Sequence, residues 1–274
     1  GDFPNVRICA LKAAYPMGDE VVLIYEATGR VIKPGGLPID ENVVVYNVET
    51  MYNLYRAVHL NIPVTNKLVS IVGEIDHPLT VRVPLGTTVK EAISLAGKIT
   101  VEDPAYVMGG PMMGRLGTEN TVITKTNAII ILPKDHHVVV RMEKNLDIEK
   151  RRASSSCCQC RTCTDMCSRH ALGHPIEPHK VMRAVANHDL SDLSVFINAA
   201  YCSGCGICEK YACPQGLSPK SIIQQFKGGL RGAGIKVEKV EPAPVLEDRE
   251  LRKLPVHRLA ARLDLARYDK PAPF

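Results

Sequence analysis

The sequence has no Trp, and no apolar stretch approaches the roughly 18 consecutive residues that a membrane-spanning helix needs. The first residues, Gly1-Asp2-Phe3-Pro4, lack the basic and apolar regions of a signal peptide. Long charge runs are also missing: the net charge is +5, from 34 Lys+Arg and 29 Asp+Glu, and no six like charges follow one another. These absences argue against a membrane span, secretion and nucleic-acid binding, so we expect a cytoplasmic protein.

Cysteine is nearly absent outside one short region. Nine of the 10 cysteines lie between Cys157 and Cys213, and the remaining one is Cys9. A disulfide scaffold would place cysteines along the whole chain, so this clustering indicates a local metal site. The length of 274 residues allows one large domain or two to three small ones around it.

The clustered cysteines form two motifs, Cys157-x2-Cys160-x2-Cys163-x3-Cys167 and Cys202-x2-Cys205-x2-Cys208-x4-Cys213. Three thiolates at this spacing can reach three irons of a cubane, and the fourth iron needs a more distant thiolate. In two-cluster ferredoxins the fourth Cys of each run ligates the other cluster. We therefore predict two 4Fe–4S clusters, with Cys157, Cys160, Cys163 and Cys213 at cluster I and Cys202, Cys205, Cys208 and Cys167 at cluster II.

Zinc is the alternative, because eight thiolates also satisfy two tetrahedral ions. Structural zinc sites usually pair C-x2-C with a second pair, so the doubled C-x2-C-x2-C favours iron–sulfur. The motifs depart from the simple ferredoxin pattern, since Ser168 follows Cys167 and four residues precede Cys213. The exchange of fourth ligands therefore has less support than the set of eight. Cys158 fits no spacing and is expected to face away from the cluster.

Other residues of this region have predicted roles beside the thiolates. Gly204 and Gly206 should turn backbone N–H groups toward cluster sulfur, which raises the reduction potential. His170, His174 and His179 are expected to cap helices or bond the backbone, because the thiolates already suffice as ligands. The segment Val181–Val185 should form a helix between the two runs, which favours a helical ferredoxin unit over a compact bacterial ferredoxin.

Strand and helix patterns precede the cysteines. Val21–Tyr25 and Val43–Tyr46 are β-branched runs that predict buried strands, and Glu49–Leu60 predicts a helix. Within that helix three apolar residues are spaced to face a core: Leu54, Ala57 and Val58. Two strands and a helix do not close an α/β domain, so we expect the chain to begin inside a domain and to be a fragment.

The following residues predict a β-grasp-like module. Leu68–Val72 predicts one strand, and Leu79–Val83 predicts another because its apolar and polar residues alternate. Thr88 and Glu91 form a capping box before a predicted helix at Val89–Ala96. Val122–Leu132 predicts a further strand pair. The loop Gly109–Gly114 is either a backbone surface that approaches a cofactor or a turn that packs two methionines. Beyond Gly234 the chain is rich in Pro, Lys and Arg, and Val256–Ala266 predicts a short amphipathic helix.

Several segments together resemble one family. They are the run Tyr15–Arg30, Pro34–Pro38, Tyr46–Thr50, Gly109–Gly114 and the doubled cysteine motifs. In combination they resemble the cobalamin reductases of propanediol-utilisation microcompartments. That family is related to the C subunit of the Rnf complex and to the NADH- and flavin-binding subunit of complex I. Pro133–His136 and the ending Tyr268–Pro273 fit the cobalamin-reductase branch.

The resemblance implies an α+β multidomain protein. Its parts would be a partial α/β flavin-binding domain at residues 1–64, a β-grasp, SLBB-like domain at 65–140, an α-helical ferredoxin unit with two 4Fe–4S clusters at 141–234, and an extension at 235–274. By the family's motifs, Gly18, Asp19 and Glu20 would contact flavin and the nicotinamide nucleotide, and Asn47 and Thr50 would bind FMN. Asp19 replaces a Glu of the complex I pattern.

The implied activity is electron transfer from NADH through FMN and the clusters to a corrinoid, with cob(III)alamin reduced toward cob(I)alamin. The implied partners are a corrinoid or corrinoid-handling enzyme and a microcompartment shell protein. The alternative is an Rnf-like subunit or a non-enzymatic relay docked to a membrane complex or shell. The family's glycine-rich phosphate loop is absent and would precede Gly1, and a barrel-like domain would follow Phe274. We therefore expect this chain to hold its clusters firmly but FMN weakly or not at all.

Overall fold

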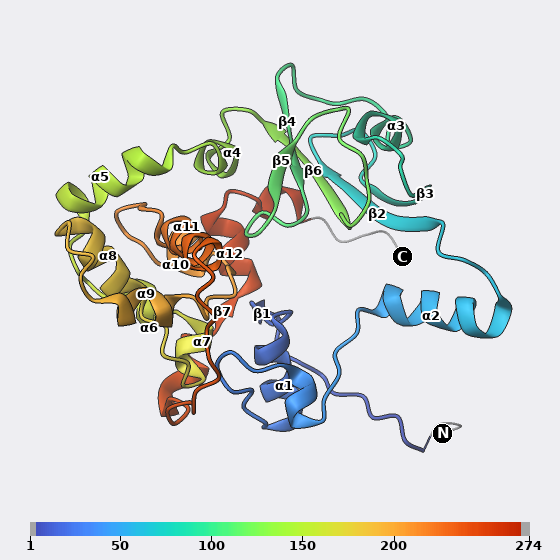
Figure 1. Ribbon diagram of the computed structural model, residues 1–274. Coiled ribbons are helices and arrows are strands. Elements are labelled where there is room, and N and C mark those ends of the chain that lie inside the picture. The colour runs from blue at the N-terminus through green and yellow to red at the C-terminus, as the bar shows by residue number, and fades with distance from the viewer. Residues whose placement is uncertain (1–3, 270–274) are drawn as a thin grey trace. The chain divides into compact units, whose positions relative to one another are not determined.

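The computed structural model describes residues 4–269, so Gly1–Phe3 and the end of the Tyr268–Pro273 segment lie outside it. The chain forms two compact units, whose elements are labelled in Figure 1. The first unit comprises the chain up to Val45 together with Leu146–Arg262. The second comprises Tyr46–Asn145 and the chain from Leu263 onward.

The second unit is built on a five-stranded sheet with the strand order β3-β2-β6-β4-β5. The strands are β2 (Asn66–Gly73), β3 (Leu79–Pro84), β4 (Pro104–Met108), β5 (Arg115–Gly117) and β6 (Ala128–Pro133). β2 runs antiparallel to β3 and parallel to β6, whereas β4 is antiparallel to both β5 and β6. The predicted strand pair at Val122–Leu132 contributes only β6, with Val122 in an isolated bridge to Thr88.

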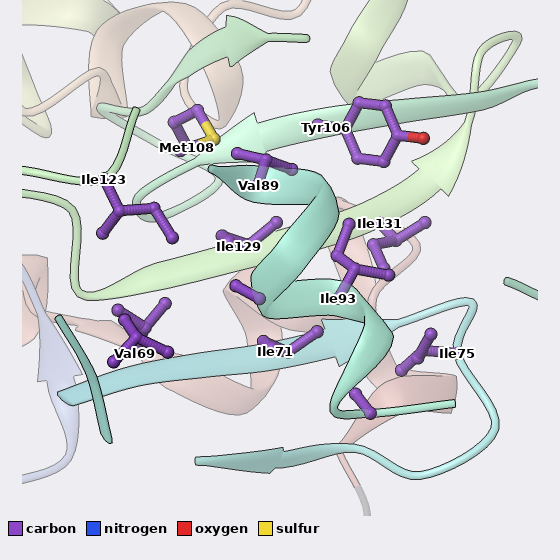
Figure 2. Packing of buried hydrophobic residues seen from close by; sticks show 13 residues of the cluster. Val69, Ile71, Ile75, Val89, Ile93, Tyr106, Met108, Ile123, Ile129 and Ile131 are labelled. Atoms are coloured by element: carbon purple, nitrogen blue, oxygen red, sulfur yellow. The ribbon is translucent and has the colours of Figure 1, made fainter. Parts of the chain in front are cut away.

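One helix, α3 (Val89–Ser94), packs its apolar face on this sheet. The predicted capping box starts it: the Thr88 hydroxyl accepts from the Glu91 N–H at 3.3 Å, and the Glu91 carboxylate accepts from the Thr88 N–H at 2.8 Å. Val89 and Ile93 then point toward sheet residues such as Ile129 (Figure 2). Sheet and helix thus share one core, as the β-grasp prediction requires.

The other helices of the second unit are α2 (Val48–Leu60), α4 (His137–Met142) and the short 3-10 turn η3 (Ala266–Tyr268). The predicted helix at Glu49–Leu60 is confirmed as α2. The prediction that its apolar residues face a core is wrong, because no residue of α2 is buried in the described structure. Leu54 is 47% exposed and Val58 is 67% exposed. In the Gly109–Gly114 loop, Met112 is buried and Met113 is exposed, so the turn packs one of its two methionines.

The first unit is mainly helical, with one two-stranded ribbon that pairs β1 (Ala14–Tyr15) with β7 (Leu254–Pro255). Its α-helices are α1 (Glu20–Thr28), α5 (Leu146–Ser156), α6 (Thr162–Asp165), α7 (Ser168–Ala171), α8 (Pro178–Ala186), α9 (Leu193–Ala199), α10 (Ile207–Lys210), α11 (Pro219–Gly232) and α12 (Val256–Arg262). Two 3-10 turns complete it, η1 (Pro38–Glu41) and η2 (Glu247–Arg252). Apolar residues of α5, α8, α9 and α11 form its main core.

The strand predicted at Val21–Tyr25 is wrong, because these residues lie in α1. Asp19 caps the helix by accepting from the Val21 and Val22 N–H groups, and Gly29 ends it in a left-handed conformation with φ 74°. These capping signals outweigh the β-branched composition. The predicted strand at Val43–Tyr46 is also wrong, since no strand forms there in the described structure.

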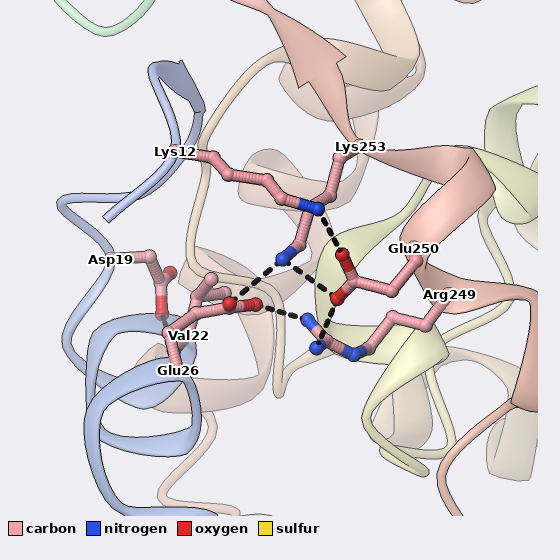
Figure 3. Close-up of polar contacts among 7 residues, drawn as sticks. All are labelled: Lys12, Asp19, Val22, Glu26, Arg249, Glu250 and Lys253. Atoms are coloured by element: carbon pink, nitrogen blue, oxygen red, sulfur yellow. Dashed lines mark hydrogen bonds and ion pairs between the residues drawn. The ribbon is translucent and has the colours of Figure 1, made fainter. Parts of the chain in front are cut away.

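An ion-pair network joins α1 to η2 and to Lys253, the residue that follows it. Glu26 of α1 pairs with Arg249 and with Lys253, the latter at 2.7 Å. Glu250 pairs with Lys253 at 2.7 Å and with Lys12 at 3.0 Å. Figure 3 shows the two carboxylates facing the three cations. Because Glu26 and its two partners are largely buried, this network holds the C-terminal extension against α1 more firmly than surface pairs would.

Acid is expected to loosen this network. Burial alone would raise the pKa of Glu26, but hydrogen bonds from Lys253 and Arg249 hold it below its usual value. Hydrogen bonds from Lys253 and Lys12 lower the pKa of Glu250 from 4.5 to about 2. A carboxylate with a depressed pKa stabilises the fold above its unfolded pKa, so this contribution is lost as the pH falls from 4.5 toward about 2.

Amide hydrogen exchange in α1, corrected for intrinsic rates, measures this loss. Protection of α1 should fall below pH 4.5, the ordinary pKa of the carboxyl group. The Glu26→Gln variant should start with lower protection and show a flatter pH response. If the parent and the variant respond to acid equally, Glu26 does not hold the extension.

Candidate functional site

The structure gathers the cysteines of the two motifs around two cavities of the first unit. Cavity I is lined by Cys157, Cys160, Cys163 and Cys213. The first run follows α5 and enters α6, whereas Cys213 follows α10, so the fourth thiol comes from the other motif. The four cysteines assigned to cluster I therefore line one cavity, and their role as ligands stays a prediction.

Cavity II is lined by Cys202, Cys205, Cys208 and Cys167. The second run follows α9 and enters α10, and Cys167 stands at the N-terminus of α7. This set likewise combines three cysteines of one motif with the last cysteine of the other. Among residues 4–269, no three His, Cys, Asp or Glu side chains converge as ligands of one single metal ion would. The thiols instead surround cavities.

The two cysteine runs share one backbone shape. Positive φ angles occur at the second and fourth residues after the first cysteine of each run. They are 56° at Gln159, 65° at Arg161, 76° at Gly204 and 84° at Gly206. Glycine adopts this left-handed conformation without strain, as predicted for the second run, whereas Gln159 and Arg161 adopt it at a cost. The repeated shape indicates that both loops wrap the same kind of object.

Hydrogen bonds point at sulfurs of both cysteine sets. In cavity II the Gly204 N–H donates to Cys202 Sγ at 3.3 Å. In cavity I the Leu217 N–H donates to Cys213 Sγ at 3.4 Å, and two side chains contribute as well. Gln159 Nε2 donates to Cys157 Sγ at 3.4 Å, and the Thr162 hydroxyl donates to Cys160 Sγ at 3.3 Å. Donors of this kind stabilise the negative charge of thiolate ligands.

Burial and mutual repulsion raise the pKa of several of these thiols. Burial, followed by the proximity of Cys213, Cys160 and Cys157, raises the pKa of Cys163 to about 12. In the other set, burial raises the pKa of Cys205 to about 11 and that of Cys208 well above its usual value. Four thiolates cannot share such a cavity without a compensating positive centre. The donor sets therefore fit metal clusters, whose cations hold thiolates in the ionised form.

Polar residues from elsewhere in the first unit support cavity II. The Tyr15 hydroxyl donates to the Cys205 carbonyl at 2.6 Å, and Lys227 Nζ donates to the Cys202 carbonyl at 2.9 Å. Arg169, two residues after Cys167, pairs with Asp19 at 2.9 Å. The sequence alone predicted no such role for Tyr15, Lys227 or Arg169. No local motif marks these residues, because their contacts depend on the tertiary fold.

The predicted flavin and nucleotide residues fall into two places. Gly18, Asp19 and Glu20 precede or begin α1 in the first unit, where Asp19 is occupied as the helix cap and as the partner of Arg169. Asn47 caps α2 of the second unit by accepting from the Glu49 N–H at 2.9 Å, and Thr50 is exposed one turn later.

Two of the three histidines near the cysteines have hydrogen-bond partners, whereas Nδ1 of His170 is buried and has none among the described residues. His174 Nε2 lies 3.0 Å from the Ile32 carbonyl, and His179 Nδ1 lies 2.8 Å from the Thr164 hydroxyl. Burial lowers the pKa of His174 to about 4 and also lowers that of His179. Cys158, which was expected to face away from the cluster, is exposed but is also among the residues that line cavity I. No helix within residues 4–269 has the length and apolar character that crossing a bilayer demands.

Comparison with known proteins gives three matches to family models. Residues 2–56 match the Nuo51 FMN-binding domain, residues 68–116 match the SLBB domain, and residues 156–218 match the 4Fe-4S dicluster domain. The predicted α+β multidomain fold class is therefore confirmed. The predicted boundaries near residues 64, 140 and 234 stay predictions.

The chain is also similar to curated proteins over most of its length. It is 41% identical over 98% of its residues to the cobalamin reductase PduS of Salmonella typhimurium (strain LT2), and 38% identical over 98% to that of Citrobacter freundii. It is 34% identical over 61% of its residues to one component of the proton-translocating ferredoxin:NAD(+) oxidoreductase complex of Clostridium ljungdahlii, of which it covers 34%. The chain spans 60% of the length of each cobalamin reductase. These matches confirm the predicted resemblance.

Proposed function

We propose that this chain forms the part of a cobalamin reductase that passes electrons from NADH, by way of FMN and two 4Fe–4S clusters, to a corrinoid. The observation that carries the proposal is the division of eight cysteines between two cavities, with one cysteine exchanged in each direction. The similarity to two cobalamin reductases over 98% of the chain supports the corrinoid as acceptor.

The proposed ligands are Cys157, Cys160, Cys163 and Cys213 at cavity I and Cys202, Cys205, Cys208 and Cys167 at cavity II. When bound, a 4Fe–4S cluster supplies one-electron chemistry. The chain itself contributes the thiolates, the N–H donors to sulfur and a largely buried setting around Cys163 and Cys208. Only three residues lie between Cys163 and Cys167, so the exchange also keeps the two cavities close in the chain.

Gly18, Asp19, Glu20, Asn47 and Thr50 are the proposed contacts of FMN and NADH. The match of residues 2–56 to an FMN-binding domain supports this assignment. Amide and hydroxyl groups such as those of Asn47 and Thr50 can hold a phosphate or flavin carbonyl. The proposed partners are a corrinoid-handling enzyme and a shell protein, and the proposed location is the interior of a bacterial microcompartment.

Asn47→Asp is expected to weaken FMN binding about tenfold. Aspartate caps a helix as well as asparagine does, so α2 should persist, but the variant removes the amide donor and adds a charge that repels phosphate. A titration that follows the quenching of FMN fluorescence measures the change. Asn61→Asp, at the other end of α2, is the matched control and should bind FMN like the parent. Equal affinities of both variants and the parent would remove Asn47 from the proposed site.

A direct test of the function uses the full chain, loaded with iron and sulfide under exclusion of air and supplied with an excess of FMN, because the chain is expected to hold FMN weakly. NADH should bleach the flavin, and cob(III)alamin should then be reduced toward cob(I)alamin. The visible absorbance of the corrinoid measures this second step. Cys208→Ala should keep the flavin bleaching but slow the corrinoid step. If Cys208→Ala reduced the corrinoid as fast as the parent does, the clusters would not lie on the electron-transfer path from flavin to corrinoid.

A relay without its own nicotinamide reaction is the second candidate. The similarity to a component of a ferredoxin:NAD(+) oxidoreductase complex supports it. In that case NADH would leave the loaded protein unchanged, whereas a reduced one-electron carrier would bleach it. The same absorbance measurement therefore separates the two candidates.

A further inference from the structure

The first cysteine run places a non-glycine residue in a strained left-handed backbone conformation where the second run has glycine. At the second position after the leading cysteine, the first run has Gln159 with φ 56° and the second has Gly204 with φ 76°. Glycine would relieve the strain at residue 159, and the glycine-containing run shows that the loop shape needs no side chain there. A strained residue that persists at a proposed cofactor site points to a role for its side chain.

That side chain spans from the cavity to the surface. Gln159 Nε2 donates to Cys157 Sγ at 3.4 Å, and Gln159 Oε1 accepts from Arg183 Nε at 3.3 Å. An arginine can only donate, so the oxygen end of the amide must face Arg183 and the NH2 end must face the sulfur. Arg183 thereby fixes the orientation of a group that otherwise could turn its oxygen toward a thiolate.

We propose that Gln159 raises the reduction potential of the cluster at cavity I, and that Arg183 is the positioning residue that keeps the amide turned toward Cys157. This inference rests on the proposed function. A donor to a thiolate sulfur stabilises the additional negative charge of the reduced state. Cavity II has only the backbone N–H of Gly204 at the equivalent position, at 3.3 Å from Cys202 Sγ.

A difference in reduction potential between the two cavities gives electron transfer a direction. Cavity I has an exposed cysteine, Cys160, beside the buried Cys163. Of the described cysteines that line cavity II, none is exposed: one is buried, Cys208, and the other three are partly buried. A higher potential at cavity I favours the electron at the edge that a one-electron acceptor can approach. The side chain at residue 159 thus sets cavity I as the exit side of the pair.

Potentiometric measurement of the full chain, loaded without air and monitored by electron paramagnetic resonance, tests this. Gln159→Leu and Arg183→Leu should each lower the midpoint potential of the cavity I signal and leave that of cavity II unchanged. Arg183→Lys retains a cationic donor and should stay closer to the parent than Arg183→Leu. Gln225→Leu, an exposed position of α11, is the control and should move neither signal. Comparison with Cys157→Ser, which removes a cavity I ligand, assigns the signals.

An unchanged cavity I potential in both Gln159→Leu and Arg183→Leu would overturn the inference, as would an equal shift at both cavities. If Gln159→Leu loses iron, Arg183→Leu, which leaves the cysteine loop intact, decides alone. A parent protein that binds no iron–sulfur cluster would refute the proposed function itself. Failure of the two proposals is therefore distinguishable.

Discussion

Cys213→Ser is expected to remove the cluster from cavity I and to spare the one at cavity II. Cys213 follows the second run in sequence but lines the cavity of the first, together with Cys157, Cys160 and Cys163. Serine is a poor substitute for a thiolate ligand, so the variant should lose about half of its iron, the share of one cluster in two. The mirror variant, Cys167→Ser, should empty cavity II.

Iron analysis and electron paramagnetic resonance of the two variants check this result. Each should retain a single simple signal, and the two signals should differ. Cys158→Ser is the matched control, because Cys158 is exposed and adjacent to a ligand, and it should keep all of its iron. Cys157→Ser and Cys202→Ser mark the signals of cavities I and II. If Cys213→Ser lost the signal that Cys202→Ser loses, instead of the one that Cys157→Ser loses, the exchange would be wrong.

Gly173→Ala is expected to destabilise the first unit by about 3 kcal/mol. Gly173 has φ 84°, and an added Cβ would lie 1.9 Å from the carbonyl oxygen of Ala243. The neighbouring backbone cannot yield without loss of its hydrogen bonds, since the Ala243 N–H donates to Gly173 and the Leu246 N–H donates to Ala171. The substitution should therefore detach the C-terminal extension from α7, which follows Cys167.

Thermal unfolding and limited proteolysis measure this destabilisation. The extension around Ala243 should become the first site of cleavage in the variant. Gly228→Ala provides the control, because Gly228 lies inside α11, has open space around its Cα, and should gain slightly in stability from the better helix former. Equal stability of Gly173→Ala and the parent would show that the extension can move away without cost.

The spacing within each run predicted that its three cysteines lie together, because two intervening residues let a loop reach neighbouring corners of one object. The fourth cysteine of each set was expected from the pattern of two-cluster ferredoxins, and the ligand roles of all eight stay predictions. The capping box at Thr88 and Glu91 likewise predicted the start of α3, since both partners are close in sequence. Within each run and within the capping box, the residues that decide the structure are close in sequence. Local chemistry was sufficient there.

Other features depend on contacts that no local pattern reveals. The β-branched run at Val21–Tyr25 predicted a strand, but Asp19 and Gly29 bound a helix whose apolar face packs on Leu172. The left-handed conformation of Gln159 was unpredictable, because glutamine rarely adopts it and only the fold shows the contact with Arg183.

Electron paramagnetic resonance of the dithionite-reduced protein, prepared without air, tests the central claim most directly. Two reduced 4Fe–4S clusters held in neighbouring cavities should give a broadened spectrum in which the two paramagnets interact, at about eight irons per chain. A protein that carries zinc and gives no signal, or one that gives a single uncoupled signal at about four irons per chain, would contradict the account.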